Sequence, residues 1–365
     1  MVLVLIAVCV LAFANGANDN AKGVATLIGG RTWPRNRALT LALVTTFMGS
    51  VAAILLAGGL VAKFSGKGLI DDAILTSAAF PTCVAVAAGV TVLLATRLAM
   101  PISTTHALVG AIVGVGLGAH GLHVASIVSA FFVPLLVAPL LAIGLAAVGY
   151  VMLRFVRLRL QVNRNTCVCI ERTYHPVQVE PCGSLLVAAT GVKLANSFTV
   201  SDCVDRYDGQ IAGIDAQRVL DTSHILSAAA ISFARGLNDT PKIAALMIAA
   251  GGFTASGSLI GVGIAMALGG ALAVRRVAET MSHKVTEMND GQAFTANLAT
   301  AACVLVASRF GVPVSTTHVS CGSLFGIGMV NGQAHVPMIA KIGLAWVTTL
   351  PLAAALGWTL WKLLA

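Results

Sequence analysis

The sequence predicts an all-α membrane protein with two inverted-topology repeats of about five helical segments each. Broken helices and re-entrant half-helices are expected at the membrane midplane. Three observations lead to this fold class. The composition is too apolar for a soluble protein of this length, apolar segments occur as two sets separated by a polar interval, and two sequence motifs each occur twice.

The composition is that of a membrane protein. Hydrophobic residues make up 57% of the 365 residues, charged residues only 10%, and the mean hydropathy is +0.90. A soluble chain of this length needs more polar surface than this. Most of the net charge of +9 lies in short stretches beside apolar segments, without the interleaved aromatics of a nucleic-acid site. We therefore expect a lipid bilayer around the chain and no nucleic-acid partner.

The apolar segments are long enough to cross a hydrocarbon core of roughly 30 Å as helices. The first set covers about 2–28, 38–61, 78–98, 101–119 and 123–156. The second set covers about 223–250, 253–274, 293–310, 313–330 and 336–364. The predicted domains are a first transmembrane repeat at 1–157, a cytoplasmic loop or small domain at 158–222, and a second transmembrane repeat at 223–365.

Two motifs are duplicated in the same order. Residues 13–25, FANGANDNAKGVA, match 233–245, FARGLNDTPKIAA, at 7 of 13 positions with an offset of 220. Residues 101–116, PISTTHALVGAIVGVG, match 313–328, PVSTTHVSCGSLFGIG, at 8 of 16 positions with an offset of 212. Two matched islands in one order indicate an internal duplication.

An odd number of crossings per half makes the repeats inverted, whether each half crosses with five segments or with three and a re-entrant hairpin. Basic residues after the first and fifth segments of the first half are Arg31, Arg35, Arg37, Arg154, Arg157, Arg159 and Arg164. In the second half they follow the second segment instead, at Arg275, Arg276 and Lys284. Basic loops stay in the cytoplasm. We therefore expect a multi-pass protein of the plasma (inner) membrane, with both termini outside and the central loop cytoplasmic.

Polar residues interrupt the first apolar segment of each half, namely Asn15, Asn18 and Asp19, and Asn238 and Asp239. Such residues cost free energy in a membrane unless they pair or line an aqueous cavity. The adjacent Gly16 and Gly236 would let the backbone leave the helix, and freed carbonyls with a carboxylate make a natural cation site. The alternative is an Asn or Asp cap at an ordinary helix end, which the duplication disfavours.

The Pro-(Ile/Val)-Ser-Thr-Thr-His stretches at 101–106 and 313–318 predict helix N-termini placed within the membrane. Free N–H groups, the positive end of the helix dipole and three hydroxyls suit a tetrahedral anion. In the alternative interpretation, Ser103 and Ser315 only cap their own helices. The first-turn His106 and His318 are as consistent with local hydrogen bonding as with contact to substrate or a proton.

Lys22 and Lys242 follow the two Asn-Asp pairs at matched positions. Their ammonium groups add positive potential near an anion or snorkel to a membrane interface, and the sequence slightly favours snorkelling. Four of the eight cysteines lie in apolar segments and are expected to act as small apolar residues: Cys9, Cys83, Cys303 and Cys321. The other four are Cys167, Cys169, Cys182 and Cys203, whose predicted cytoplasmic side argues against disulfides and whose spacing is not that of a zinc finger. No metal site is predicted.

Taken together, these motifs resemble the inorganic phosphate transporter (PiT) family, which includes sodium/phosphate symporters and proton-coupled bacterial relatives. The resemblance rests on GANDNA at 16–21, GLNDTP at 236–241 and both PxSTTH stretches, and it covers both halves but not the central loop. It implies a secondary active transporter that carries inorganic phosphate with a coupled Na⁺ or H⁺ by alternating access. The partners would be phosphate and the coupling cation, and a homodimer is compatible with the sequence.

The resemblance also implies roles for individual residues. Asp19 and Asp239, with Asn15 and Asn297, would bind the coupling cation. The substrate-binding residues would be Asn18, Ser103, Thr104, Thr105, Asn238, Ser315, Thr316 and Thr317. This sequence departs from the family pattern at Asn297, where many relatives carry a glutamate. The second copy of its motif also departs from the first, with Arg235 opposite Asn15 and Pro241 opposite Ala21.

Other function classes fit less well. Sulfate or another oxyanion on the same scaffold is the close alternative. An anion channel is disfavoured because paired buried aspartates would repel anions in an open pore. No Walker A pattern is present, so the chain carries no ATPase of its own. An intramembrane hydrolase is disfavoured because Ser103 and His106 lie one helical turn apart without an orienting acid. We therefore expect no enzyme, no catalytic residue and no cofactor besides the coupling ion.

Overall fold

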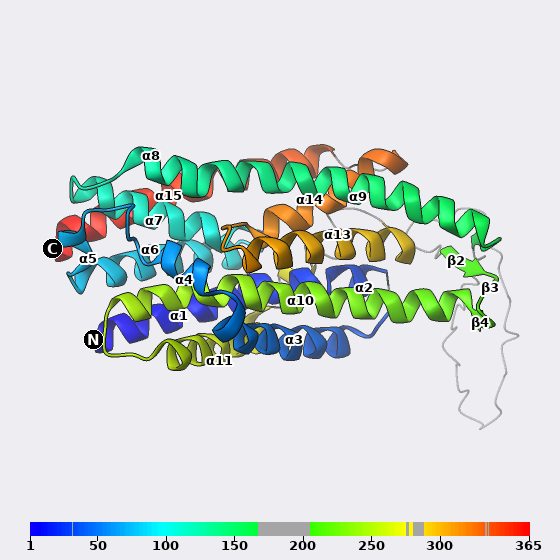
Figure 1. Cartoon of the computed structure of the whole chain (residues 1–365), viewed down its shortest axis with the longest axis horizontal. Coiled ribbons are helices and arrows are strands. Elements are labelled where there is room, and N and C mark those ends of the chain that lie inside the picture. Colours follow the sequence, from blue (N-terminus) through cyan, green and yellow to red (C-terminus); the bar gives the residue numbers. More distant parts are fainter. Residues whose placement is uncertain (31, 167–204, 275–276, 280–287, 333, 335) are drawn as a thin grey trace, which may run out of the picture. The chain divides into compact units, whose positions relative to one another are not determined.

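The computed structural model describes residues 1–30, 32–166, 205–274, 277–279, 288–332, 334 and 336–365, and most of them are helical (Figure 1). These residues form two compact units, one made of Met1–Val156 with Leu220–Ala365 and the other of Arg157–Val219. The topogenic residues Arg31, Arg275, Arg276 and Lys284 lie outside the described residues, as do the four cysteines of the central loop.

Helices occupy each predicted apolar segment, which confirms the all-α membrane class. The first half contains α1 (Val2–Asp19), the 3-10 turn η1 (Asn20–Gly23), α2 (Ala25–Gly29), α3 (Arg35–Leu56), α4 (Gly58–Phe64), α5 (Asp72–Leu75), α6 (Ala79–Arg97), α7 (Thr104–Gly118), α8 (Val124–Ile127), the π-helical turn η2 (Val128–Phe132) and α9 (Val133–Arg159). The second half contains α10 (Ala216–Ala249), α11 (Ala255–Ala273), α13 (Asp290–Arg309), α14 (Thr316–Asn331) and α15 (Val336–Leu364).

The smaller unit holds two short antiparallel pairs of strands within its described residues. Strand β1 (Asn163–Thr166) pairs with β2 (Asp205–Asp208), and β3 (Gln210–Ile211) pairs with β4 (Ile214–Asp215). The guanidinium of Arg157 lies 5.6 Å from the ring centroid of Tyr207, which places a cation over an aromatic face.

The first polar motif ends its α-helix, but after Asp19 and not at Gly16, which lies inside α1, so the predicted role of Gly16 in the break is wrong. Helix α1 ends at Asp19, and the chain leaves helical geometry at Val24, where φ is −116° and ψ is 6°. A Cβ on Gly23 would lie 2.3 Å from the Ser232 hydroxyl oxygen, so a larger residue there would require the Ser232 side chain to move.

The prediction of a matching break in the second half is wrong. Helix α10 continues through Asn238 and Asp239 to Ala249, with Pro241 inside it. The position matched to Gly23 is Ile243, a buried core residue that carries none of the helix penalty of glycine. The two copies therefore place similar side chains on different backbones.

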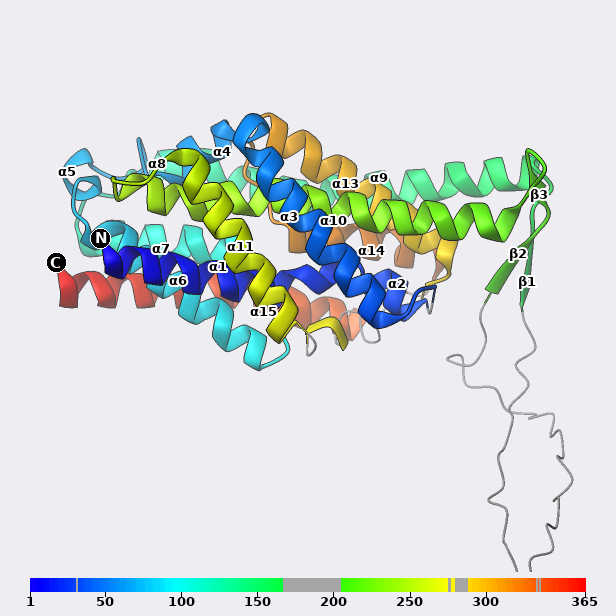
Figure 2. The same ribbon diagram turned by 90° about the horizontal axis from the view of Figure 1, so that it is seen from below.

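Helices of the two halves pack in exchanged pairs. Gly16 of α1 lies against α11, where a Cβ would come within 1.9 Å of the Met266 carbonyl oxygen. Gly236 of α10 meets α3 in the same way, at 1.9 Å from the Thr46 carbonyl oxygen. Figure 2 shows α3 and α11 crossing obliquely over α10 and α1. Glycine is thus required at both crossings because the backbones touch.

The helices near the site follow the same exchange. Gly114 of α7 approaches the Ala354 carbonyl of α15, and Gly326 of α14 approaches the Ile143 carbonyl of α9, with Cβ distances of 2.0 and 2.4 Å. Each fourth segment therefore packs on the fifth segment of the opposite half.

Seven helices in the described part of the chain are long and apolar enough to cross a membrane. Large apolar side chains are exposed on them, such as Leu55 at 87% and Leu136 at 70%. Exposed apolar surface on this scale suits contact with lipid. Helices α7 and α14 have 15 and 16 residues. At 1.5 Å per residue these are shorter than a hydrocarbon core of about 30 Å.

Candidate functional site

The N-termini of α7 and α14 are buried inside the helical bundle. Ser103 accepts a hydrogen bond from the His106 N–H at 3.1 Å, and Ser315 accepts one from the His318 N–H at 3.2 Å. Both serines are therefore N-caps, as the alternative interpretation held. Each hydroxyl still has its hydrogen to donate, since capping uses only an acceptor lone pair. The first N–H groups of both helices have no partner within the helix.

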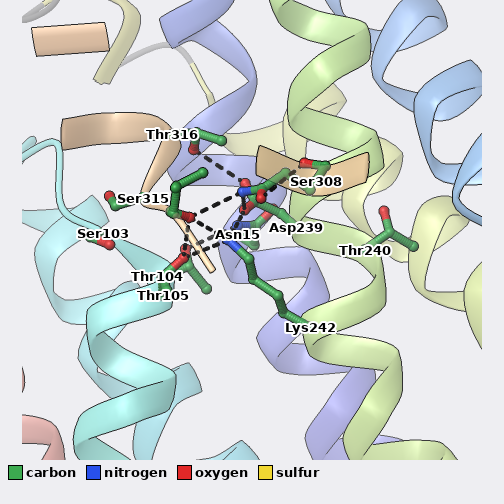
Figure 3. Close-up of polar contacts among 12 residues, drawn as sticks. Asn15, Ser103, Thr104, Thr105, Asp239, Thr240, Lys242, Ser308, Ser315 and Thr316 are labelled. Carbon is green, nitrogen blue, oxygen red and sulfur yellow. Dashed lines mark hydrogen bonds and ion pairs between the residues drawn. The ribbon is translucent and has the colours of Figure 1, made fainter. Parts of the chain in front are cut away.

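Each buried aspartate accepts hydrogen bonds from the turn of its own half. Thr104 donates to Asp19 Oδ2 at 3.3 Å, and Thr316 donates to Asp239 Oδ2 at 3.3 Å. Asn15 adds two hydrogen bonds from its amide nitrogen, to Asp19 Oδ2 at 3.0 Å and to Thr104 Oγ1 at 2.9 Å. Figure 3 shows Asn15, Thr104, Thr316 and Asp239 lying together although they come from separate elements.

The two asparagines of the Asn-Asp pairs hold the turns in place. The Asn18 amide donates to Thr96 Oγ1 at 3.0 Å and to the Met100 carbonyl at 3.1 Å, and its oxygen accepts from the Ile102 N–H at 3.3 Å. Both polar atoms of the Asn18 side chain thus form hydrogen bonds with the end of α6 or with the segment that joins it to α7.

Asn238 does the same for the segment that leads into α14. Its amide nitrogen donates to the Val314 carbonyl at 3.2 Å and to Asp239 Oδ1 at 2.9 Å, and its oxygen accepts from the Ser308 hydroxyl at 3.2 Å. Asn18 and Asn238 thus hold the two turns in position, and their contact with substrate stays a prediction.

The lysines that follow the Asn-Asp pairs are buried, so the prediction that they snorkel is wrong. Lys22 is 3% exposed and Lys242 is 1% exposed. The ammonium of Lys22 donates to Asp19 Oδ1, to the Ile102 carbonyl at 2.7 Å and to Thr317 Oγ1 at 2.7 Å. Snorkelling fails because all three ammonium hydrogens find acceptors deep in the bundle.

Lys242 has the matching set of partners. Its ammonium donates to Asp239 Oδ1 at 3.2 Å, to the Val314 carbonyl at 2.6 Å and to Thr105 Oγ1 at 2.8 Å. In both sets the carboxylate and carbonyl come from the half that contains the lysine, and the threonine comes from the other half. The expected cation site at the two aspartates is thus occupied by side-chain ammonium groups.

Arg235 is fully buried, and none of its three side-chain nitrogens has a hydrogen-bond partner among the described residues. Its charge acts on both Asp19 and Asp239. The sequence already singles out this residue, since Arg235 stands where the first copy of the motif has Asn15. It does not indicate that the guanidinium would be buried in the site. A buried guanidinium without partners is costly unless a ligand supplies the acceptors.

The charges of this site do not cancel. Two buried carboxylates, Asp19 and Asp239, face three buried cationic side chains, Lys22, Lys242 and Arg235. One positive charge is left over. Together with two helix N-termini, this excess makes the site complementary to an anion.

Asn297 is not part of this cluster. Its amide donates to Thr26 Oγ1 at 3.0 Å and to Ser227 Oγ at 3.4 Å. The same hydroxyl of Thr26 lies 3.1 Å from His224 Nε2, and His224 pairs with Asp290 at 3.4 Å. The expected contact of Asn297 with the cation site is therefore replaced by a second polar cluster between α2, α10 and α13.

The two motif histidines meet across the halves. The rings of His106 and His318 have their centroids 4.2 Å apart, and His318 stacks on Trp346 at 3.8 Å. His106 Nδ1 and His318 Nε2 have no hydrogen-bond partner among the described residues. In the same part of the chain, no group of three or more His, Cys, Asp or Glu side chains could hold a metal ion.

Sequence reasoning missed several buried polar residues that support the site. Thr96 and Ser308 hold Asn18 and Asn238, and they are related by the same offset of 212 that relates the two turns. Thr240 donates to the Ser50 hydroxyl at 2.7 Å and so joins α10 to α3. The offset of 212 could have revealed Thr96 and Ser308 from the sequence. The contact between Thr240 and Ser50 depends on how α10 packs against α3.

Comparison with known proteins gives a consistent result. The profile of a phosphate transporter family matches residues 15–357. A candidate phosphate permease of Pyrococcus furiosus is 25% identical over 97% of this chain and 93% of its own length. A candidate low-affinity inorganic phosphate transporter of Mycobacterium tuberculosis is 27% identical over 98% of this chain and 76% of its own length.

A solved structure, named as the sodium-dependent phosphate transporter, has a TM-score of 0.74 to this chain. It is 23% identical, and the match covers 100% of this chain and 98% of the other. At this identity the likeness establishes the shared fold.

Proposed function

The chain belongs to the phosphate transporter family, and we propose that it carries inorganic phosphate across the membrane as a secondary active transporter. The coupling cation is Na⁺ or H⁺. Transport proceeds by alternating access, in which one repeat moves against the other and the binding site opens to one side of the membrane at a time. The termini lie outside the cell and the central loop lies in the cytoplasm.

One observation carries this proposal: the buried site contains three basic and two acidic side chains, and the Arg235 guanidinium has no hydrogen-bond partner among the described residues. An unpaired buried charge is costly. A bound oxyanion would remove that cost by accepting hydrogen bonds from the guanidinium, which matches phosphate oxygens in a bidentate manner.

The donors for the remaining oxygens come from the two buried turns. Ser103 and Ser315 can each donate a hydroxyl hydrogen, and the first N–H groups of α7 and α14 are unpaired within their helices. The four expected threonine hydroxyls already donate to carboxylates or carbonyls, in Thr104, Thr105, Thr316 and Thr317. We therefore assign substrate contact to the serine hydroxyls and to main-chain N–H groups.

The exchanged packing of the halves supports alternating access. Lys22 of the first half contacts Thr317 of the second, and Lys242 contacts Thr105 in return. Two matched sets of contacts around one site are what two repeats that rock about a fixed centre would use.

Sulfate is the alternative substrate, and the protonation states of the two anions favour phosphate. Phosphate is present near neutral pH as a monoanion as well as a dianion, and its monoanion would neutralise a single excess positive charge. Sulfate is only a dianion in this pH range and would leave the site with an excess negative charge. This preference does not require a hydrogen bond from the phosphate P–OH group to an aspartate, because both aspartates already accept hydrogen bonds from lysine and threonine.

Uptake of radiolabelled phosphate into proteoliposomes tests the proposal, with sodium and pH gradients imposed separately and protein-free liposomes as the control. We expect concentrative uptake under at least one gradient, little affected by excess sulfate. Lack of uptake under both gradients would contradict the proposal, and strong inhibition by sulfate would favour the alternative substrate. Counterflow of unlabelled phosphate separates a carrier from a channel.

A further inference from the structure

We propose that the ammonium groups of Lys22 and Lys242 permanently occupy two oxygen-lined sites that would otherwise bind Na⁺, so that phosphate transport by this chain does not depend on Na⁺. The inference rests on the proposed function, because it specifies the coupling of that same site.

Each ammonium lies in a cage of three kinds of oxygen. Lys22 contacts a carboxylate of Asp19, the main-chain carbonyl of Ile102 and the hydroxyl of Thr317, the last two both at 2.7 Å. Carboxylate, carbonyl and hydroxyl oxygens are the ligands that transporters with broken helices offer to monovalent cations. An ammonium brings three donors to three acceptors, so the cage is full.

The second cage repeats the first with residues of the opposite halves. Lys242 contacts Asp239, the Val314 carbonyl at 2.6 Å and the Thr105 hydroxyl at 2.8 Å. Lys22, Asp19 and their counterparts differ by 220 in number, and the carbonyl and threonine partners differ by 212. Because both halves form the same cage with residues at matched positions, the occupation of the cages by lysine follows from the internal repeat and is not a single local contact.

The threonine hydroxyls are oriented for a cation. Thr317 donates its hydrogen to the Ile102 carbonyl at 2.9 Å, and Thr105 donates to the Val314 carbonyl at 3.3 Å. Each hydroxyl therefore turns an oxygen lone pair toward the ammonium nitrogen. An ion with the same charge and without a tether would find the same ligands.

The charges around each lysine disfavour the binding of an additional Na⁺. Lys22 is faced by Asp19 of α1, Arg235 of α10, and His318 and Cys321 of α14. Each carboxylate is already paired with an ammonium, so a further cation would meet net repulsion.

The surroundings of Lys242 are of the same kind. The groups that face it are Asp239 of α10, Asp19 of α1 and His106 of α7. Of the two coupling cations in the proposed function, the proton is therefore the one that remains.

The test compares Na⁺ with choline at equal ionic strength and equal pH gradient. The purified full chain is assayed for phosphate uptake in proteoliposomes, for ²²Na⁺ binding and for a shift of its melting temperature by Na⁺. The variants are Lys22→Ala and Lys242→Ala, each of which opens one cage. Lys63→Ala removes an exposed lysine of α4 and is the matched control.

We expect the wild type and Lys63→Ala to take up phosphate equally in both salts and to bind no Na⁺. In Lys22→Ala and Lys242→Ala, uptake should become about tenfold greater in Na⁺ than in choline, and Na⁺ should raise the melting temperature.

Saturable ²²Na⁺ binding or Na⁺-dependent uptake by the wild type would overturn the inference. Folded alanine variants that neither bind Na⁺ nor respond to it would also overturn it, since the opened cages would then not be cation sites. If the variants do not fold, ²²Na⁺ binding by the wild type decides. A wild type that takes up no phosphate in either salt contradicts the proposed function, while the ²²Na⁺ measurement still judges the cages.

Discussion

The hydroxyl of Thr317 donates to the main-chain carbonyl of Ile102 at 2.9 Å and thereby joins the buried turns of the two halves. The reciprocal hydrogen bond runs from Thr105 to the Val314 carbonyl at 3.3 Å. Each turn thus precedes its own half-helix and also forms part of the lysine cage of the other half. The site is shared between the repeats, so a substitution in one half should alter the contacts of the other half as well.

Arg235→Met should weaken phosphate binding by about 10- to 100-fold, the factor expected for loss of a charge-assisted hydrogen bond of about 1.5–3 kcal/mol. The melting temperature of the phosphate-free protein should hold or rise, because the substitution removes an uncompensated buried charge. Equilibrium binding of radiolabelled phosphate and thermal unfolding measure the two effects. Arg37→Met, at an exposed position of α3, is the control. A lower melting temperature with unchanged affinity would show a purely structural role.

Asp19→Asn and Asp239→Asn should each abolish phosphate uptake without preventing membrane insertion. Each substitution leaves a buried lysine without its counter-charge, which costs about 3–5 kcal/mol of stability. Adding Lys22→Met to Asp19→Asn should recover part of that stability, because the pair is coupled. Reversible denaturation measures the cycle, and Asp72→Asn at an exposed position of α5 is the control. Strictly additive effects would mean that the ion pair contributes nothing.

Gly16→Ala should lower the free energy of unfolding by about 1–3 kcal/mol, the usual cost of overpacking. The new Cβ would lie 1.9 Å from the Met266 carbonyl oxygen, so α1 and α11 would have to separate. Gly261→Ala on α11 is the matched control, since a Cβ there meets no atom within 4 Å. Denaturation in detergent measures both variants. Equal stabilities would indicate that the crossing can relax without cost.

Cysteine labelling tests the proposed orientation in a background without the eight native cysteines. Ala255→Cys, at the exposed start of α11, should react with an impermeant reagent in intact cells, whereas Asn163→Cys in β1 should react only after permeabilisation. Ala255 is preferable to the neighbouring Gly251, whose φ of +73° lies in the left-handed region that favours glycine. Labelling of Asn163→Cys from outside would reverse the orientation.

The sequence by itself determined the class of protein, the segments that form helices and the residues on which the site depends. Composition and apolar length identify membrane helices because the bilayer imposes a minimum span. The duplicated motifs led to Asp19, Asp239 and both Ser-Thr-Thr turns because polar residues in such segments are costly unless functional. The serine caps were also foreseen, as one of two interpretations of the same pattern.

Only the tertiary structure decided what these residues contact. Burial of Lys22 and Lys242, the unpartnered guanidinium of Arg235 and the departure of Asn297 to a second cluster all depend on packing between the halves. The sequence could not distinguish a lysine that snorkels from one whose ammonium is enclosed, because both have the same apolar neighbours along the chain. The acceptors that hold each ammonium come partly from the opposite repeat, and the fold alone brings them within hydrogen-bond distance.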